Sequence, residues 1–151
     1  MFNVRLGAAA TIDRDYLCDY NRGWRRGQFV LGLEAAYAVD GDKRAYLGID
    51  PQFQFQDYCT TINLPLTFQY DIDLPVKGLY IYPKVNAGVS IWVQDYRRYD
   101  NVFFDLELAV GLKYQFHPNI HFGADPLGFV FYIGDTFAAQ YHFFAYIGFD
   151  V

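Results

Sequence analysis

The sequence contains little charge and no long apolar stretch. Charged residues make up 19% of the 151 residues, below the roughly 25% usual for soluble domains. The net charge of −5 argues against nucleic acid as a partner, because phosphate binding needs a basic face. No segment approaches the ~18 consecutive apolar residues of a transmembrane helix. A membrane form of this chain would have to be a closed β-barrel, the other structure that pairs every backbone group in hydrocarbon.

The N-terminus carries no visible secretory signal. Residues Met1 to Arg5 begin directly in a strand-like pattern. We expect either a cytosolic protein or a mature chain from which a signal has been removed, and the features below favour the mature chain. The length predicts one domain, residues 1–151.

Aromatic residues are abundant, at 21%, and apolar and polar residues alternate along most of the chain. A period of two is typical of a β-strand with two different faces. The apolar sets contain no charge and no amide, and segments of about ten residues suit strands that cross a membrane. The alternating segments are 2–11, 28–40, 44–56, 61–72, 79–94, 104–116, 120–133 and 141–151.

Two features interrupt the alternation. The seventh segment loses its pattern from Pro126 to Ile133. Prolines stand inside predicted strands at Pro51, Pro65, Pro83 and Pro126, where each removes a backbone donor. We expect bulges or local kinks at these positions.

The connectors alternate between two kinds. Residues 40–43, 73–78 and 117–119 form one set of turns, and residues 12–27, 57–60, 95–101 and 134–140 form the other. In an up-and-down barrel each set lies at one rim. The longest connector belongs to the second set, so we place that rim outside the cell.

Alternation alone does not say which face points inward. A soluble lipocalin-like barrel that binds a hydrophobic ligand has the same period with the faces reversed. Here the polar face mixes glycine and alanine with tyrosine, which suits a narrow interior. Its charges also balance, so that they could pair inside a closed lumen. The predicted lumen network is Arg5, Arg44, Lys84 and Lys113 with Glu34, Asp50, Asp105 and Glu107.

Aromatic residues on the apolar face gather toward the two rims. Membrane interfaces select such belts on either side of an aliphatic band. One predicted belt is Tyr37, Tyr70, Tyr114 and Phe149, and the other is Phe29, Phe53, Phe55, Phe104, Tyr141 and Phe143. The prediction is an all-β, eight-stranded, antiparallel up-and-down transmembrane barrel with a polar, side-chain-filled lumen.

Three stretches carry a resemblance to a known family. Asn63 to Tyr70, Leu79 to Val89 and Ala109 to Asn119 resemble strands and a turn of the small OmpA-like and OmpX-like outer-membrane barrels, also called porin-like β-barrels. The resemblance spans nearly the whole chain. It implies a location in the bacterial outer membrane and leaves the function open.

Cysteine and histidine indicate little chemistry. Cys18 and Cys59 fall in connectors of the same rim, where a disulfide could link two outer loops in an oxidising compartment; the alternative is two unpaired thiols. His121 and His142 are expected near opposite rims, and His117 in a turn. No spacing matches a zinc or haem site, so the sequence predicts neither a metal nor a cofactor.

The outer loops and one polar triplet are the candidate functional features. Arg22, Trp24, Arg25 and Arg26 could hold lipopolysaccharide phosphates, or could form a solvated polar loop. Lipid A deacylases and palmitoyltransferases share this kind of fold, and Ser90, Asp105 and His142 all lie on the polar face. A catalytic triad there is conceivable, but the lumen is too narrow for an acyl chain.

The prediction for function is a non-enzymatic structural or surface-interaction barrel. We expect a monomer that contacts membrane lipids, with lipopolysaccharide as a candidate partner and no nucleic acid. The alternatives are a soluble lipocalin-like barrel, a small channel and a lipid A-modifying enzyme.

Overall fold

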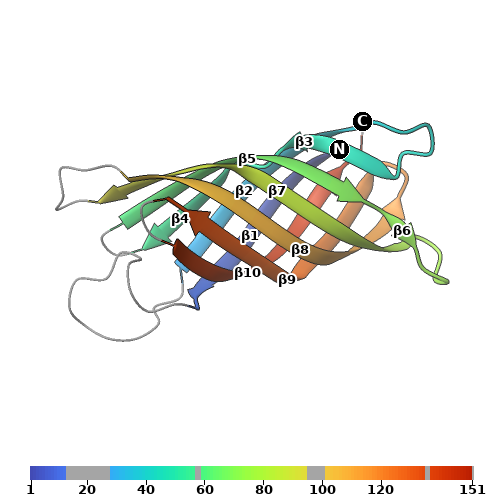
Figure 1. The fold of residues 1–151 in the computed structure, drawn as a ribbon. Helices are drawn as coiled ribbons and strands as arrows, with labels where there is room; N and C mark the ends of the chain where they lie inside the picture. Colours follow the sequence, from blue (N-terminus) through green and yellow to red (C-terminus); the bar gives the residue numbers. More distant parts are fainter. Residues whose placement is uncertain (13–27, 57–58, 95–100, 135–136, 151) are drawn as a thin grey trace.

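The computed structural model describes residues 1–12, 28–56, 59–94, 101–134 and 137–150, and nearly all of them lie in antiparallel strands (Figure 1). No helix within these ranges is long and apolar enough to cross a membrane. The strands are β1 (Phe2–Thr11), β2 (Gln28–Ala38), β3 (Ala45–Ile49), β4 (Gln52–Gln56), β5 (Cys59–Tyr70), β6 (Ile72–Asp73), β7 (Leu79–Gln94), β8 (Asn101–His117), β9 (Ile120–Ile133) and β10 (Phe137–Phe149).

These ten segments form a ring of eight strands. Both β3 and β4 pair with β2 on one side and β5 on the other, so they are one strand interrupted at Asp50 and Pro51. Both β5 and β6 pair with β7, so they also act as one strand. The ring closes because β1 pairs with β2 and with β10. Every pair is antiparallel, and the predicted up-and-down barrel is confirmed.

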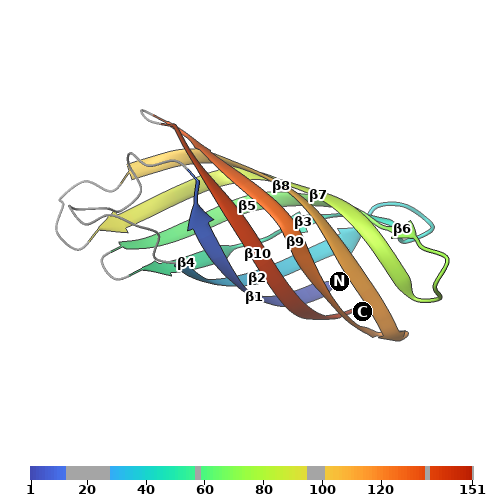
Figure 2. The same ribbon diagram turned by 90° about the horizontal axis from the view of Figure 1, so that it is seen from below.

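The barrel has two distinct rims. Both termini lie at the end that carries β6 and the β2–β3 connection (Figures 1 and 2). The short β6–β7 and β8–β9 connections lie there too, and we call this end the inner rim. The opposite end, where β1 ends and β2 begins, is the outer rim.

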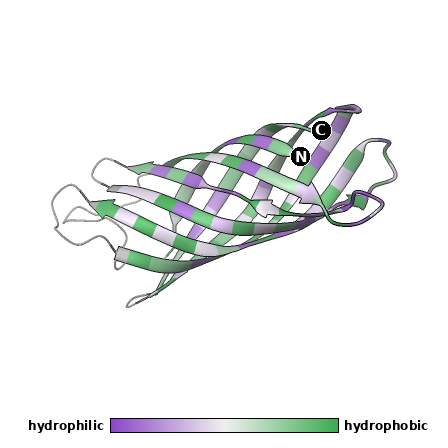
Figure 3. Ribbon diagram, turned by 90° about the horizontal axis from the view of Figure 1, so that it is seen from above, coloured by the Kyte–Doolittle hydropathy of each residue, from purple (hydrophilic) through white to green (hydrophobic). Residues whose placement is uncertain are grey.

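The apolar face of the sheet points outward. Leu64, Leu66 and Phe68 are 54%, 64% and 45% exposed, whereas Glu107 is 4% exposed. The alternation runs along each strand as apolar and polar bands (Figure 3). A soluble barrel with an apolar pocket would show the reverse, so the lipocalin-like alternative is excluded. In a membrane, the outward side chains contact acyl chains.

The predicted aromatic belts lie on this exterior. Tyr37, Tyr70, Tyr114 and Phe149 are exposed near the inner rim, where Tyr70 pairs with Ala45 and Tyr114 with Leu79. Phe29, Phe55, Phe104 and Phe143 are exposed toward the outer rim, whereas Phe53 and Tyr141 of the same predicted belt are half-buried. Amphipathic rings at these two levels suit the lipid headgroup regions.

A β-bulge at Pro126 explains where the alternation of the seventh segment fails. Strand β9 continues to Ile133, but three steps from Asp125 to Gly128 oppose only two steps from Phe144 to His142 on β10. The register against β8 shifts at the same place. The inward residues therefore change from odd to even numbers, and the predicted loss of pattern is a change of phase within one strand.

The other prolines behave differently from one another. Pro51 lies in the break between β3 and β4, and its carbonyl still accepts a bond of 2.9 Å from the backbone nitrogen of Leu33. Pro65 and Pro83 pass through β5 and β7 without a register shift, so no bulge forms at either position.

Candidate functional site in the barrel lumen

Arg5 is the centre of a buried network of charges. It projects inward from β1, is fully buried, and pairs with Asp50, between β3 and β4, and with Asp125 on β9. Its guanidinium carbon lies 4.0 Å from the centre of the Phe144 ring on β10. Arg5 thus connects three separate parts of the barrel wall. A buried charge of this kind is tolerated because it is paired.

Lys84 is the second cation of this layer. Its Nζ lies 2.9 Å from Glu34 Oε2 and 3.0 Å from Asp50 Oδ2. The amides of Gln52 and Asn86 also donate to Asp50 Oδ2, at 3.2 and 3.0 Å. Asp50 is therefore surrounded by donors from several strands, which compensates for its loss of water.

Toward the inner rim the network ends in a separate pair. Lys113 on β8 pairs with Asp71, and its Nζ lies 5.0 and 5.2 Å from the centres of the Tyr46 and Tyr80 rings. These contacts combine an ion pair with cation–π attraction. A cavity of about 520 Å³, lined in part by Lys113 and Asp71, opens at this rim.

Toward the outer rim the lumen is closed by an apolar layer. Trp92 packs on Phe103 and Tyr132, with ring centres 4.4 and 5.4 Å apart. Val130 and Ala138 complete the cluster, and all five side chains are buried. Sequence reasoning missed this layer, although Trp92 lies two residues after Ser90 on β7 and therefore points to the same inward face.

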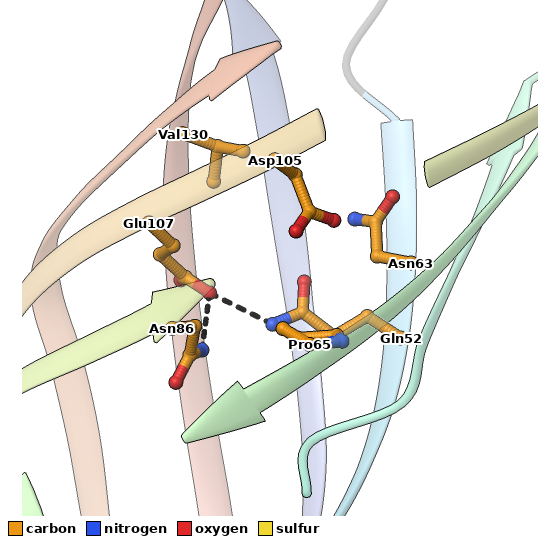
Figure 4. Close-up of a pocket in the computed structure, with 7 residues that line it drawn as sticks. All are labelled: Gln52, Asn63, Pro65, Asn86, Asp105, Glu107 and Val130. Carbon is orange, nitrogen blue, oxygen red and sulfur yellow. Dashed lines mark hydrogen bonds between the residues drawn. The ribbon is translucent and has the colours of Figure 1, made fainter. Parts of the chain in front are cut away.

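Between the charged layer and the apolar layer lies a small gap. It is lined by Gln52, Asn63, Pro65, Asn86, Asp105, Glu107 and Val130 (Figure 4). Gln52 Nε2 and Asn86 Nδ2 donate to Glu107 Oε2 at 2.8 and 2.6 Å. The gap leaves no space for a water molecule.

The structure places seven of the eight predicted network residues inside the lumen: Arg5, Glu34, Asp50, Lys84, Asp105, Glu107 and Lys113 are all buried. The placement predicted for Arg44 requires correction. Its side chain is 46% exposed at the inner rim and pairs with Asp73. By the alternation of side chains along β3, Arg44 stands at a position that should point inward. It precedes the first residue of β3, however, so its side chain reaches water instead of the lumen.

Asp71 and Asp125 join the buried network in its place. The signal that could have identified them was alternation, because both residues stand at polar positions of their strands and these positions point inward. With them, the predicted balance of charge is lost. The described, buried lumen contains the cations Arg5, Lys84 and Lys113 against the carboxylates Glu34, Asp50, Asp71, Asp105, Glu107 and Asp125.

The conceivable triad is not assembled. Ser90 Oγ lies 2.6 Å from Asp105 Oδ2 and 2.7 Å from Asn63 Oδ1, and the residue is fully buried. The Nε2 atom of His142 lies 3.4 Å from Gln54 Nε2 and 3.1 Å from Gln140 Oε1. A triad requires the histidine to contact the hydroxyl. Here the carboxylate contacts it instead.

The loop predictions fall outside the described residues. Arg22, Trp24, Arg25, Arg26 and Cys18 all belong to the connector of residues 13–27. Cys59 is the first residue of β5. The predicted disulfide and the predicted loop site therefore remain predictions.

Comparison with known proteins gives likeness in fold. No family profile and no curated protein sequence matches the chain. Neisserial surface protein A has 16% identity over 99% of this chain and 97% of that chain, with a TM-score of 0.72. The outer membrane enzyme PagL has 14% identity over 95% and 97%, with a TM-score of 0.62. The attachment invasion locus protein Ail of Yersinia pestis has 14% identity over 98% and 95%, with a TM-score of 0.52.

These structures share the architecture that the sequence predicted, that of the small OmpA-like and OmpX-like barrels. Together with the outward apolar face and the aromatic belts, they confirm the predicted fold of a transmembrane β-barrel. Because one neighbour is an enzyme and another carries the name of a surface protein, the fold alone does not choose between these functions.

Proposed function

We propose that this chain is a non-enzymatic, non-conducting outer-membrane barrel that acts through the surface at its outer rim. The observation that carries the proposal is the filled lumen. Charged, amide and aromatic side chains occupy it in successive layers, and the three buried cations of the described lumen each pair with at least one carboxylate. What the barrel offers to other molecules is then its exterior and its loops.

The filled lumen argues against a channel. An ion needs a continuous water path, but the apolar layer of Trp92, Phe103 and Tyr132 closes the outer half. Below it, the gap beside Glu107 does not admit a water molecule. We expect the purified protein in planar bilayers to conduct no more than bilayers without protein. Stable unitary conductance steps would refute this part of the proposal.

The position of Ser90 argues against a hydrolase. Its hydroxyl is buried and held by Asp105 and Asn63, so an ester carbonyl in the membrane could not reach it. We expect no release of fatty acid from lipid A by the pure protein. Hydrolysis by the wild-type chain that is lost in Ser90→Ala would establish the enzyme alternative and overturn the proposal.

The outer surface has a candidate partner in lipopolysaccharide. Three arginines and a tryptophan stand in the connector between β1 and β2, which leaves the barrel at the outer rim. Arginine forms paired, charge-assisted bonds with phosphate. The names of two structural neighbours, a surface protein and an attachment protein, agree with a role of this kind.

Binding of fluorescent lipopolysaccharide to the detergent-solubilised barrel tests this partner. We expect the triple change Arg22→Ala, Arg25→Ala and Arg26→Ala to weaken binding by about tenfold or more for each phosphate contact that is lost, since each charge-assisted contact contributes about 1.5–3 kcal/mol. Lys77→Ala removes an exposed cation at the inner rim and should leave binding unchanged. Equal binding by the triple variant and the wild type would contradict the assignment.

A further inference from the structure

His121 lies beside the seam of the barrel, the pairing of β1 with β10 that closes the ring. The register places Asn3 on β1, Gly148 on β10 and His121 on β9 side by side at the inner rim. Gly148 has no side chain, and a methyl group there would meet both Asn3 Oδ1 and His121 Nε2. The side chains from β1 and β9 therefore contact each other across the intervening strand.

Both ring nitrogens of His121 face oxygen atoms. Nε2 lies 2.8 Å from Asn3 Oδ1, and Nδ1 lies 3.2 Å from Asp150 Oδ2. The amide of Asn3 is oriented by its other end, because Nδ2 donates to Glu34 Oε2 at 3.0 Å. That oxygen also accepts a bond from Lys84 Nζ, so it acts as an acceptor. The amide of Asn3 must therefore present its oxygen to the imidazole.

Asp150 is a carboxylate at the other nitrogen of the ring. It follows β10, outside the membrane-spanning strands, and its side chain is 27% exposed. Burial raises the pKa of this carboxyl, but the hydrogen bond and the charge of His121 outweigh burial, and the pKa lies below its ordinary value. A neutral imidazole has only one N–H. Acceptors at both nitrogens therefore require an imidazolium, which donates from each.

We propose that protonated His121 is a clamp that fastens the seam of the barrel at the inner rim, and that loss of one proton releases it. The imidazolium joins β9 to Asn3 on β1 and to Asp150 at the end of β10, so it holds three neighbouring strands together. Through Asn3 and Glu34 the clamp is continuous with Lys84 and the central network of the lumen.

The other groups around the clamp do not replace this proton. The titratable and charged ones are Tyr146 on β10, Lys113 on β8, Glu34 on β2 and the N-terminal amine. Lys113 pairs with Asp71, and the amine donates to the backbone carbonyl of Ala36. Gln115 on β8 gives Asp150 only a long bond of 3.5 Å. Among the described residues, His121 is thus the charged hydrogen-bond donor to Asp150.

The clamp should make the barrel less stable as the pH rises. An unfolded histidine takes up its second proton only below about pH 6.5, whereas in the folded barrel both protons are held by acceptors. The stabilisation is therefore complete at low pH and is lost when the folded imidazolium gives up a proton. Urea unfolding in lipid vesicles at about pH 5.5 and about pH 9 measures this loss. We expect the urea midpoint of the wild type to fall by roughly 0.5–2 M more than that of His121→Gln.

His117→Gln is the matched control. It makes the same chemical change at an exposed histidine, whose Nδ1 accepts a bond of 3.4 Å from the backbone nitrogen of Asn119. This variant should keep the full pH dependence of the wild type. Asp150→Asn removes the carboxylate of the clamp from a half-exposed position and should lose most of the dependence. Titration of the N-terminal amine is common to all four proteins and cancels in the comparison.

A second measurement keeps the proposal testable if His121→Gln does not fold. Nitrogen-15 NMR of the folded wild type in detergent shows which ring nitrogens carry protons, and comparison with His117→Gln and Asp150→Asn identifies the ring of His121. Two protonated nitrogens on this ring at about pH 5.5, with one proton lost toward about pH 9, support the clamp. A single proton at the lower pH overturns it, as do equal falls in the urea midpoint for the wild type and His121→Gln.

Discussion

Replacing Arg5 by methionine should destabilise the barrel more than any comparable change at its rims. The guanidinium pairs with Asp50 and Asp125 and lies over Phe144, with no exposure to water. Methionine retains much of the volume but leaves two buried carboxylates with fewer cation partners. Breaking one side of a buried ion pair costs about 3–5 kcal/mol. Arg5→Met should therefore lower the free energy of unfolding by about that amount.

The two carboxylates should not respond equally. Asp50 keeps Lys84, 3.0 Å away, whereas Asp125 keeps, among the described residues, only the hydrogen bond that the Tyr82 hydroxyl donates to it. Asp125→Asn removes the charge that Arg5→Met leaves unpaired. The double variant should therefore recover about 1 kcal/mol or more relative to Arg5→Met alone.

Arg44→Met is the matched control for this prediction. It removes the same charge from an ion pair with Asp73 that is about half exposed, for which we expect a loss of about 0–1 kcal/mol. Equilibrium unfolding in urea, with the protein in lipid vesicles and tryptophan fluorescence as the signal, measures both variants. If Arg5→Met and Arg44→Met differ by less than about 1 kcal/mol, the assignment of Arg5 as the centre of the lumen network is refuted.

Three further changes test the exterior, the bulge and the packing of the lumen. Leu66→Arg places a charge on the lipid face, so it should cost about 2–4 kcal/mol in vesicles, whereas Val76→Arg in an inner-rim turn should cost little. Tyr141→Phe removes the hydroxyl that donates to the carbonyl of Pro126 at the bulge, and the unpaired carbonyl should cost about 1–3 kcal/mol. Gly111→Ala places a methyl group against two lumen side chains and should cost about 1–3 kcal/mol.

Each of these changes has a control. Tyr37→Phe alters an exposed tyrosine of the inner belt, and Gly41→Ala adds a methyl group where nothing lies within 4 Å. Both should change the free energy of unfolding by less than about 0.5 kcal/mol. A tolerated Leu66→Arg would place the apolar face away from lipid. A neutral Tyr141→Phe would show that the carbonyl at the bulge finds another donor.

The sequence by itself determined the strands, their two faces and the barrel. In a strand, successive side chains point to opposite sides, so the parity of a residue assigns its face without any knowledge of its neighbours. Alternation separated an uncharged face from a polar one, and the small and tyrosine residues of the polar face together with the two aromatic belts identified the uncharged face as the lipid side. Parity also placed Ser90 and His142 inside, where the structure has them buried.

Only the tertiary structure decided which inward residues meet. Alternation assigns both Arg5 and Arg44 to the inward face of the sheet. In the structure Arg5 lies within the barrel, whereas Arg44 is exposed at its rim. Asp125 reaches Arg5 across 120 positions of sequence, just before the bulge that changes the phase of β9. Contacts of this kind depend on the closure and stagger of all eight strands together. Alternation is a property of each strand alone and carries no information about that stagger.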